Sequence, residues 1–161
     1  GIIYLFIVAY SAYYLRENFG LKIFIFIIII CIFTDIGGYI FGKLFKGPKL
    51  IKISPNKTYA GMIGGFTLSI IAGLIYKENI SIYIYQIENL DYFYQIKNSE
   101  FLVITLLISA VSQIGDLIIS YFKRLAKVKD TGKLLPGHGG LLDRVDGIIF
   151  AVPIFYLILT L

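Results

Sequence analysis

The sequence has no tryptophan, one cysteine, one histidine and few charged residues, and the last three shortages each exclude a class of protein or site. Only 16% of the 161 residues are charged, against about 25% in a typical soluble domain, and 58% are hydrophobic. With a mean hydropathy of +0.82, the chain is not an ordinary water-soluble domain and is typical of an integral membrane protein. A lone cysteine forms no internal disulfide, so we interpret Cys31 as a lipid-facing side chain. Without a second histidine or a cysteine cluster, no zinc site is expected.

Five apolar segments are long enough, or nearly so, to cross a bilayer, which takes about 20 residues of helix. They are Ile2–Leu15, Leu21–Phe41, Ala60–Tyr76, Phe101–Phe122 and Ile148–Leu161, the last extended back to Leu141. The sequence therefore predicts an all-α, polytopic membrane helix bundle with about five transmembrane helices, forming a single membrane-embedded domain over residues 1–161. Because the chain begins at Gly1 inside an apolar run, we expect further helices to precede it.

The basic residues are concentrated in two connections. Gly42–Thr58 holds five and Lys123–Gly147 holds six, eleven of the fifteen in the chain, whereas Lys77–Glu100 has more acids than bases. Alternating spans place both basic connections on one side of the membrane, and the positive-inside rule makes that side cytoplasmic. The tyrosine-rich segment Ser81–Gln95 is polar enough to lie in the membrane interface.

Two carboxylates, Asp35 and Asp116, lie inside the apolar spans. A carboxylate in a membrane costs at least ~2.5 kcal/mol on insertion scales, so both are candidate functional residues. The alternative is a structural role, as a hydrogen bond between helices or a pair with a lysine. Asp116 also belongs to a stripe of polar residues at helical spacing: Ser109, Ser112, Asp116, Ser120 and Lys123. The stripe fits either helix packing or a polar cavity that opens toward the basic side.

Glycines recur at a spacing that favours helix packing. Gly38 and Gly42 form a GxxxG pair beside Asp35, and Gly61 and Gly65 form another in the next span. Because such pairs let two backbones approach closely, we expect them to bring Asp35 into the bundle.

The stretch SPNKT, Ser54 to Thr58, is predicted to be a loop before the third span. Ser54 or Thr58 is suited to cap that helix. Alternatively, a helix N-terminus beside Lys57 forms an anion site.

The longest polar stretch is KDTGKLLPGHGGLLDRVDG, from Lys129 to Gly147. Asp143 and Asp146 would share one face at the start of the last helix, where their oxygens, with Asp116 close by, suit a divalent cation. Glycines around His138 let backbone N–H groups approach a phosphate, although a solvated loop histidine fits equally well. A metal and phosphates at a cytoplasmic face indicate a nucleotide or polyphosphate site.

The segment SYFKRLAKVKDTGKLLPGHGGLLDRVDG, Ser120 to Gly147, closely resembles the signature of the phosphatidate cytidylyltransferases, or CDP-diacylglycerol synthases. The likeness extends to GDL at Gly115–Leu117, to SPNKT and to TDIGGYIFGK at Thr34–Lys43. Three positions depart from the family pattern. The family commonly has Glu where this chain has Ala60 and Ile119, and it often has Ser where this chain has Gly147.

The resemblance implies transfer of the cytidylyl group of CTP to phosphatidic acid, giving CDP-diacylglycerol and pyrophosphate in phospholipid biosynthesis. It implies Mg²⁺ as the cofactor, with a second cation left open. We also expect a bacterial inner (plasma) membrane enzyme with its active site facing the cytoplasm. The expected partners are membrane lipids and a second copy of the chain in a homodimer, with no nucleic acid. Relative to the family, the chain is expected to be the C-terminal catalytic part.

The resemblance also implies roles for individual residues. The expected metal ligands are acidic: Asp116, Asp143, Asp146 and, less centrally, Asp35. The expected catalytic set adds the groups that contact CTP phosphates: Asp116, Lys123, Arg124, Lys129, His138, Asp143, Arg144 and Asp146. The expected substrate-binding set consists of residues that would contact CTP, the lipid phosphate or pyrophosphate: Ser54, Lys57, Thr58, Lys127, Gly139 and Gly140.

Two other functions remain open from the sequence. A CTP-dependent polyprenol or lipid-alcohol kinase would use the same nucleotide but would release CDP rather than pyrophosphate. An ion-coupled transporter would use Asp35 and Asp116 as its ion site, but it leaves the basic, glycine-rich stretch unexplained.

Overall fold

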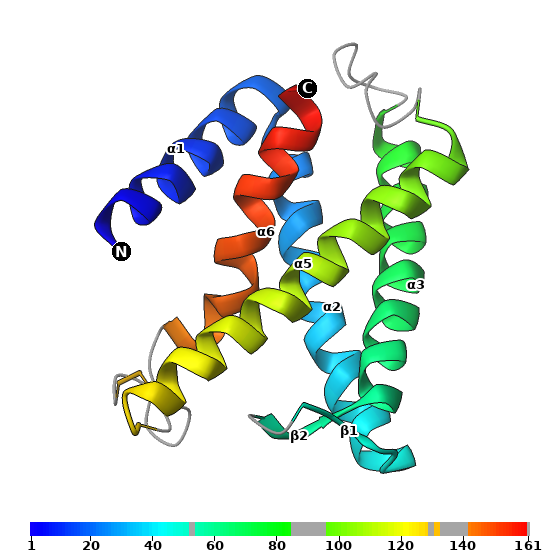
Figure 1. Ribbon diagram of the computed structural model, residues 1–161. Helices are drawn as coiled ribbons and strands as arrows, with labels where there is room; N and C mark the ends of the chain where they lie inside the picture. The colour runs from blue at the N-terminus through cyan, green and yellow to red at the C-terminus, as the bar shows by residue number, and fades with distance from the viewer. Residues whose placement is uncertain (52–53, 85–95, 129–130, 133–141, 161) are drawn as a thin grey trace.

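A computed structural model describes residues 1–51, 54–84, 96–128, 131–132 and 142–160 (Figure 1). Within these residues the chain forms helices and one short sheet. The helices are α1 (Ile2–Phe19), α2 (Leu21–Phe45), α3 (Tyr59–Ile84), α5 (Asn98–Leu125) and α6 (Leu142–Thr160). The sheet pairs β1 (Lys49–Ile51) with β2 (Ser54–Thr58). The predicted helical bundle is confirmed, with the hairpin as an unexpected addition.

Three segments of the described chain are long and apolar enough to cross a membrane, which fits an integral membrane protein. They are Ile2–Phe45, which contains both α1 and α2, then Tyr59–Asn79 and Asn98–Leu125. The apolar helical segment Val145–Thr160 is shorter. The predicted count of about five transmembrane helices is therefore not confirmed. Most of the proposed interfacial segment lies outside the described residues, and its first residues, Ser81–Ile84, continue α3.

The core of the bundle is centred on α2. The ring of Phe26 lies 5.8 Å from that of Tyr76 on α3, 5.4 Å from Phe101 on α5 and 6.5 Å from Phe155 on α6. Cys31 is 1% exposed and belongs to the same buried cluster, so its predicted lipid-facing position is wrong. Isoleucine-rich segments are equally compatible with lipid contact and with the interior of a helix bundle. Here several helices pack around the segment that contains Cys31.

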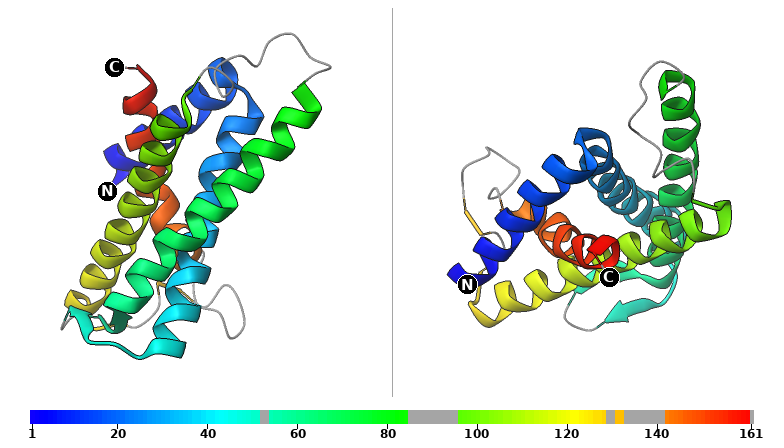
Figure 2. Two further views of the ribbon diagram at one scale, coloured as in Figure 1. Left: turned by 90° about the vertical axis from the view of Figure 1, so that its right-hand side faces the viewer. Right: turned by 90° about the horizontal axis from the view of Figure 1, so that it is seen from above.

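Glycine backbones hold α2 against α3, and the two helices run side by side in Figures 1 and 2. A Cβ atom on Gly61 would lie 2.6 Å from the carbonyl oxygen of Gly38 and 3.4 Å from Cα of Gly42. The predicted GxxxG contact is therefore confirmed. An approach still closer was not predicted: a Cβ on Gly37 would overlap the carbonyl oxygen of Gly64 and lie 2.9 Å from Cα of Gly65.

The stretch predicted as a loop is strand β2, which pairs antiparallel with β1. Lys49 is opposite Thr58, and Ile51 is opposite Ser54. Pro55 is compatible with this strand because a two-stranded ribbon has an open edge, where a missing N–H costs no ladder bond. The amide of Tyr59 then donates to the carbonyl of Pro48 at 3.2 Å, which joins the hairpin to the first residue of α3.

The described parts of both basic connections lie at one end of the bundle. In Figures 1 and 2 the hairpin, the end of α5 and the start of α6 are together, while the C-terminus and the turn between α1 and α2 are at the other end. This agrees with the shared side that the charge pattern predicted.

Two adjacent glycines on α2 provide a matched test of the α2–α3 contact. Gly37→Ala should destabilise the protein by about 1–3 kcal/mol, because the added methyl group meets the α3 backbone, which cannot rotate away. Gly38→Ala should be tolerated, because among the described residues its methyl group would meet only the Gly61 carbonyl oxygen, at 3.8 Å. Thermal unfolding in the same detergent measures both, and equal stabilities would contradict this packing.

Candidate functional site

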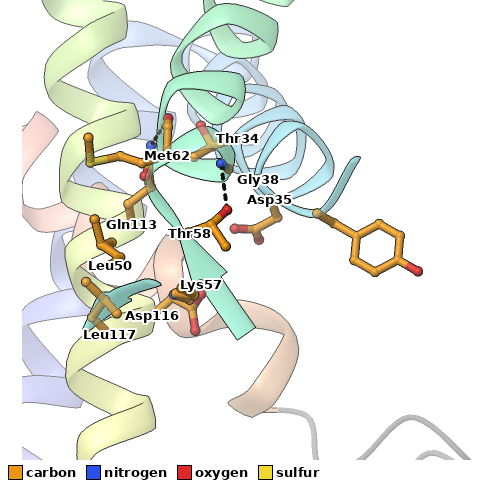
Figure 3. A pocket seen from close by; sticks show the side chains of 12 residues that line it. Thr34, Asp35, Gly38, Leu50, Lys57, Thr58, Met62, Gln113, Asp116 and Leu117 are labelled. Carbon is orange, nitrogen blue, oxygen red and sulfur yellow. Dashed lines mark hydrogen bonds and ion pairs between the residues drawn. The ribbon is translucent and has the colours of Figure 1, made fainter. Parts of the chain in front are cut away.

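A pocket of about 260 Å³ lies between α2, α3, α5 and the hairpin, at the basic end of the bundle (Figure 3). Its polar lining comes from Thr34, Asp35, Lys57, Thr58, Gln113 and Asp116. Its other lining residues are Gly38, Tyr39, Leu50, Gly61, Met62 and Leu117. The pocket thus joins the two intramembrane carboxylates with Lys57 and Thr58 of the SPNKT stretch, although these are far apart in the sequence.

The central interaction is an ion pair between the Lys57 ammonium and Oδ2 of Asp116. Both side chains are about a quarter exposed, at 27% and 26%, and both line the pocket. The hydroxyl of Ser120 lies 3.4 Å from Oδ1 of the same carboxylate. Pairing with a lysine was the structural alternative for Asp116, and it is what the structure contains. Lys57 was expected to bind a substrate phosphate, and its contact with Asp116 was not predicted.

Two further carboxylates share the electrostatic environment of this pair. Asp35 is repelled by Asp116 and attracted by Lys57. Asp146 is repelled by Asp116 and Asp35 and attracted by Lys123, and its Oδ1 accepts the backbone N–H of Gly147 at 3.0 Å. Asp146 is only 7% exposed. Asp35 and Asp116 therefore line one pocket, and Asp146 on α6 is near enough to interact electrostatically with both, with Lys57 and Lys123 as the opposing cations.

Thr58 caps helix α3. Its Oγ1 accepts the backbone N–H of Gly61 at 3.1 Å, as expected for a residue that precedes the first helical turn. This confirms one of the two predicted caps and fixes Lys57, its neighbour, at the pocket wall. Ser54 is at the far end of β2, opposite Ile51, and does not line the pocket.

The polar stripe on α5 serves two purposes. Ser109 shares a 2.8 Å hydrogen bond with Thr34 of α2, which is helix packing. Ser112 is fully buried against α6, where a Cβ on Gly147 would overlap its hydroxyl. Asp116, in contrast, lines the pocket, as the cavity interpretation predicted. Gly147 is one of the departures from the family pattern. The position of Ser112 requires a glycine there, because a larger residue at position 147 would displace the Ser112 side chain.

The other two departures lie near the site without lining the described pocket. Ala60 is in the first turn of α3, and a Cβ on Gly47 would lie 3.6 Å from its Cβ. Ile119 is half-buried on α5, one turn beyond Asp116. Neither position supplies a carboxylate here, so among the described residues that line the pocket the acids are Asp35 and Asp116.

The remaining predicted residues are placed only in part. Lys123 and Arg124 lie in the last turn of α5 and Lys127 follows it, at the same end of the bundle as the hairpin. Asp143 and Arg144 are in the first turn of α6, as predicted, but their side chains lie outside what the structure describes. Four more are outside the described residues altogether: Lys129, His138, Gly139 and Gly140.

Gln113 is a polar pocket residue that the sequence analysis did not predict. Its Nε2 lies 3.4 Å from the carbonyl oxygen of Met62 on α3. One feature of the sequence could have predicted it: Gln113 is an amide in the middle of an apolar span. It precedes Asp116 by three residues and therefore lies on nearly the same helix face. It was not predicted because it carries no charge.

The whole chain, residues 1–161, matches the family model described as "Cytidylyltransferase family", in agreement with the resemblance. It is 40% identical to the phosphatidate cytidylyltransferase of Brucella suis biovar 1 over 142 residues, 88% of this chain and 48% of that protein. It is 37% identical to that of Staphylococcus epidermidis over 153 residues, covering 94% and 54% respectively. The chain spans about half the length of the curated relatives it matches. The chain belongs to the cytidylyltransferase family.

Proposed function

We propose that the chain forms the catalytic part of a membrane enzyme that transfers the cytidylyl group of CTP to phosphatidic acid. The observation that carries this proposal is the pocket at the basic end of the bundle, where Lys57 and Asp116 meet between membrane helices. A lipid phosphate lies at such a depth, next to the aqueous phase from which CTP arrives. The relatives named phosphatidate cytidylyltransferase support the substrate pair.

The reaction needs charge control more than a strong base. A phosphate oxygen of the lipid attacks the α-phosphorus of CTP, a new P–O bond forms, and the bond to the β-phosphate breaks as pyrophosphate leaves. The lipid phosphate is already anionic near neutral pH, so it needs little activation. The main barriers are the repulsion between two anions and the charge that develops on the leaving group, so positioning and electrostatics carry the catalysis.

The cationic side chains fit this requirement. Lys57 lines the pocket beside Thr58, and in this proposal its ammonium attracts the lipid phosphate. Lys123, Arg124 and Lys127, at the end of α5, would contact CTP phosphates, together with Lys129, His138, Arg144 and the backbone of Gly139 and Gly140. Ser54 would act at the edge of the site.

The acidic side chains fit a magnesium ion. Carboxylate oxygens are the donors that Mg²⁺ prefers, and the mutual repulsion of Asp35, Asp116 and Asp146 is what a divalent cation would offset. Among the described residues no three metal-ligating side chains form a closed site, and Asp143 would complete the set. When bound, Mg²⁺ supplies positive charge that lowers the repulsion between the substrates and stabilises pyrophosphate.

In this proposal all five helices are embedded in the membrane, and the end that carries the hairpin faces the cytoplasm of a bacterium. The excess of lysine and arginine in the two basic connections supports this orientation. The lipid reaches the pocket sideways from the bilayer. We include a homodimer in the proposal, as the resemblance implies.

Product analysis separates this function from its rivals. Purified protein given phosphatidic acid and CTP labelled at the α-phosphate should move the label into lipid and release unlabelled pyrophosphate. With a lipid alcohol in place of phosphatidic acid, release of labelled CDP together with an unlabelled lipid phosphate would identify a kinase. Absence of CTP consumption, together with cation movement in vesicles, would identify a transporter.

Two substitutions test the acids at the start of α6. Asp143→Asn and Asp146→Asn should each lower turnover at least about 100-fold, because each removes negative charge that holds the cation and positions the phosphates. Both proteins should still insert and elute as the wild type does in size-exclusion chromatography. Normal turnover in both variants would refute the metal assignment.

A further inference from the structure

Gln113 is a polar side chain in the middle of membrane-spanning helix α5, and no role proposed so far uses it. An amide taken into a membrane is costly unless its hydrogen-bonding groups are satisfied. Within the described residues its side chain makes one hydrogen bond, from Nε2 to the carbonyl oxygen of Met62 at 3.4 Å. That distance is longer than the usual range for N–H···O bonds, so the bond compensates little of the cost.

The position of Gln113 relative to the charged groups is informative. It precedes Asp116 by three residues on α5, so the two side chains lie one turn apart on nearly the same face, and both line the pocket (Figure 3). Asp116 is the nearer of the two to the basic end of α5, where Lys123 and Arg124 lie. Gln113 is therefore farther from the basic end than Asp116, which in the proposed orientation is deeper in the membrane.

The pocket lining changes from charged to uncharged side chains with distance from the basic end of α5. The charged groups Lys57 and Asp116 come from the hairpin and the later part of α5, whereas Gln113 lies beside Met62 and, through Nε2, against Gly65. A glycerophospholipid has the same order of groups along its length. Its phosphate is at the membrane surface, its ester carbonyls are next, and its acyl chains point to the centre of the bilayer.

We propose that Gln113 is a substrate-binding residue that recognises the ester carbonyl of the lipid substrate. Nε2 carries two N–H donors, of which only one is directed at Met62, and an ester carbonyl is an acceptor without a donor. This rests on the proposed function, because the lipid phosphate must occupy the region of Lys57 for its ester group to reach Gln113. The role of Gln113 would be to favour diacyl lipids over phosphorylated lipids that have no ester.

Contact with the cytosine base is the competing role for an amide in this pocket. The depth of Gln113 opposes that role, because CTP enters from the aqueous side and its phosphates are expected near the basic end of α5. The two roles differ in which substrate depends on the amide, and kinetics with each substrate distinguishes them.

The test compares dioleoyl phosphatidic acid with its dialkyl ether analogue, which keeps the phosphate and the chains but lacks both carbonyl groups. For the wild-type protein, KM for the ether lipid should be about three- to tenfold higher, the factor expected for one neutral hydrogen bond. In Gln113→Met, which keeps the length of the side chain, KM for the diacyl lipid should rise to the ether value. KM for CTP should not change.

A neighbouring substitution is the matched control. Ile114 is 54% exposed and does not line the pocket, so Ile114→Met should keep the wild-type preference for the diacyl lipid. Because the preference is a ratio measured on one preparation, partial unfolding of a variant does not alter it. A wild-type ratio in Gln113→Met, or a raised KM for CTP with that ratio unchanged, would overturn the inference. A wild-type protein that forms no CDP-lipid from either substrate would instead refute the proposed function.

Discussion

The ion pair between Lys57 and Asp116 is the interaction on which the rest of the site depends. A carboxylate in a membrane helix needs a compensating charge. Here the cation is Lys57, on a strand 59 residues earlier in the chain. The pair joins the hairpin to α5 and so closes one side of the pocket. It also places a cation and an anion where a lipid phosphate and a metal ion would each need a counter-charge, so one contact serves both stability and the proposed chemistry.

Lys57 reaches Asp116 from the hairpin, which leads directly into α3, and α3 is held close to α2. Gly37, Gly38 and Gly61 let α2 and α3 approach until backbone atoms touch, and Thr58 caps α3 at the point where the chain leaves β2. Asp35 of α2 lines the same pocket as Lys57 and Asp116. On the other side, Gly147 leaves room for Ser112, which lets α6 bring Asp146 toward Asp116. Small residues thus position the large charged ones.

The sequence predicted most helices because long apolar runs and charge-rich connections are strong signals, and the starting point of α6 and the cap at Thr58 followed from local chemistry. The hairpin was missed because three-residue pairing leaves no periodic pattern, and Cys31 was misplaced because lipid and protein interior select the same apolar residues. The partner of Asp116 and the importance of Gln113 depend on which helices become neighbours. That is a property of tertiary packing and is not encoded in any one segment.

The positive charge of Lys57 compensates the negative charge of Asp116. A double-mutant cycle tests this interaction most directly. The free energy of unfolding in detergent would be measured for the wild type, Lys57→Met, Asp116→Asn and the double variant. Each single substitution leaves one polar partner without its counterpart, so the double variant should be more stable than the sum of the single effects predicts, by about 0.5–3 kcal/mol. Strictly additive effects would contradict the account, because they would mean that the two side chains do not interact in the folded protein.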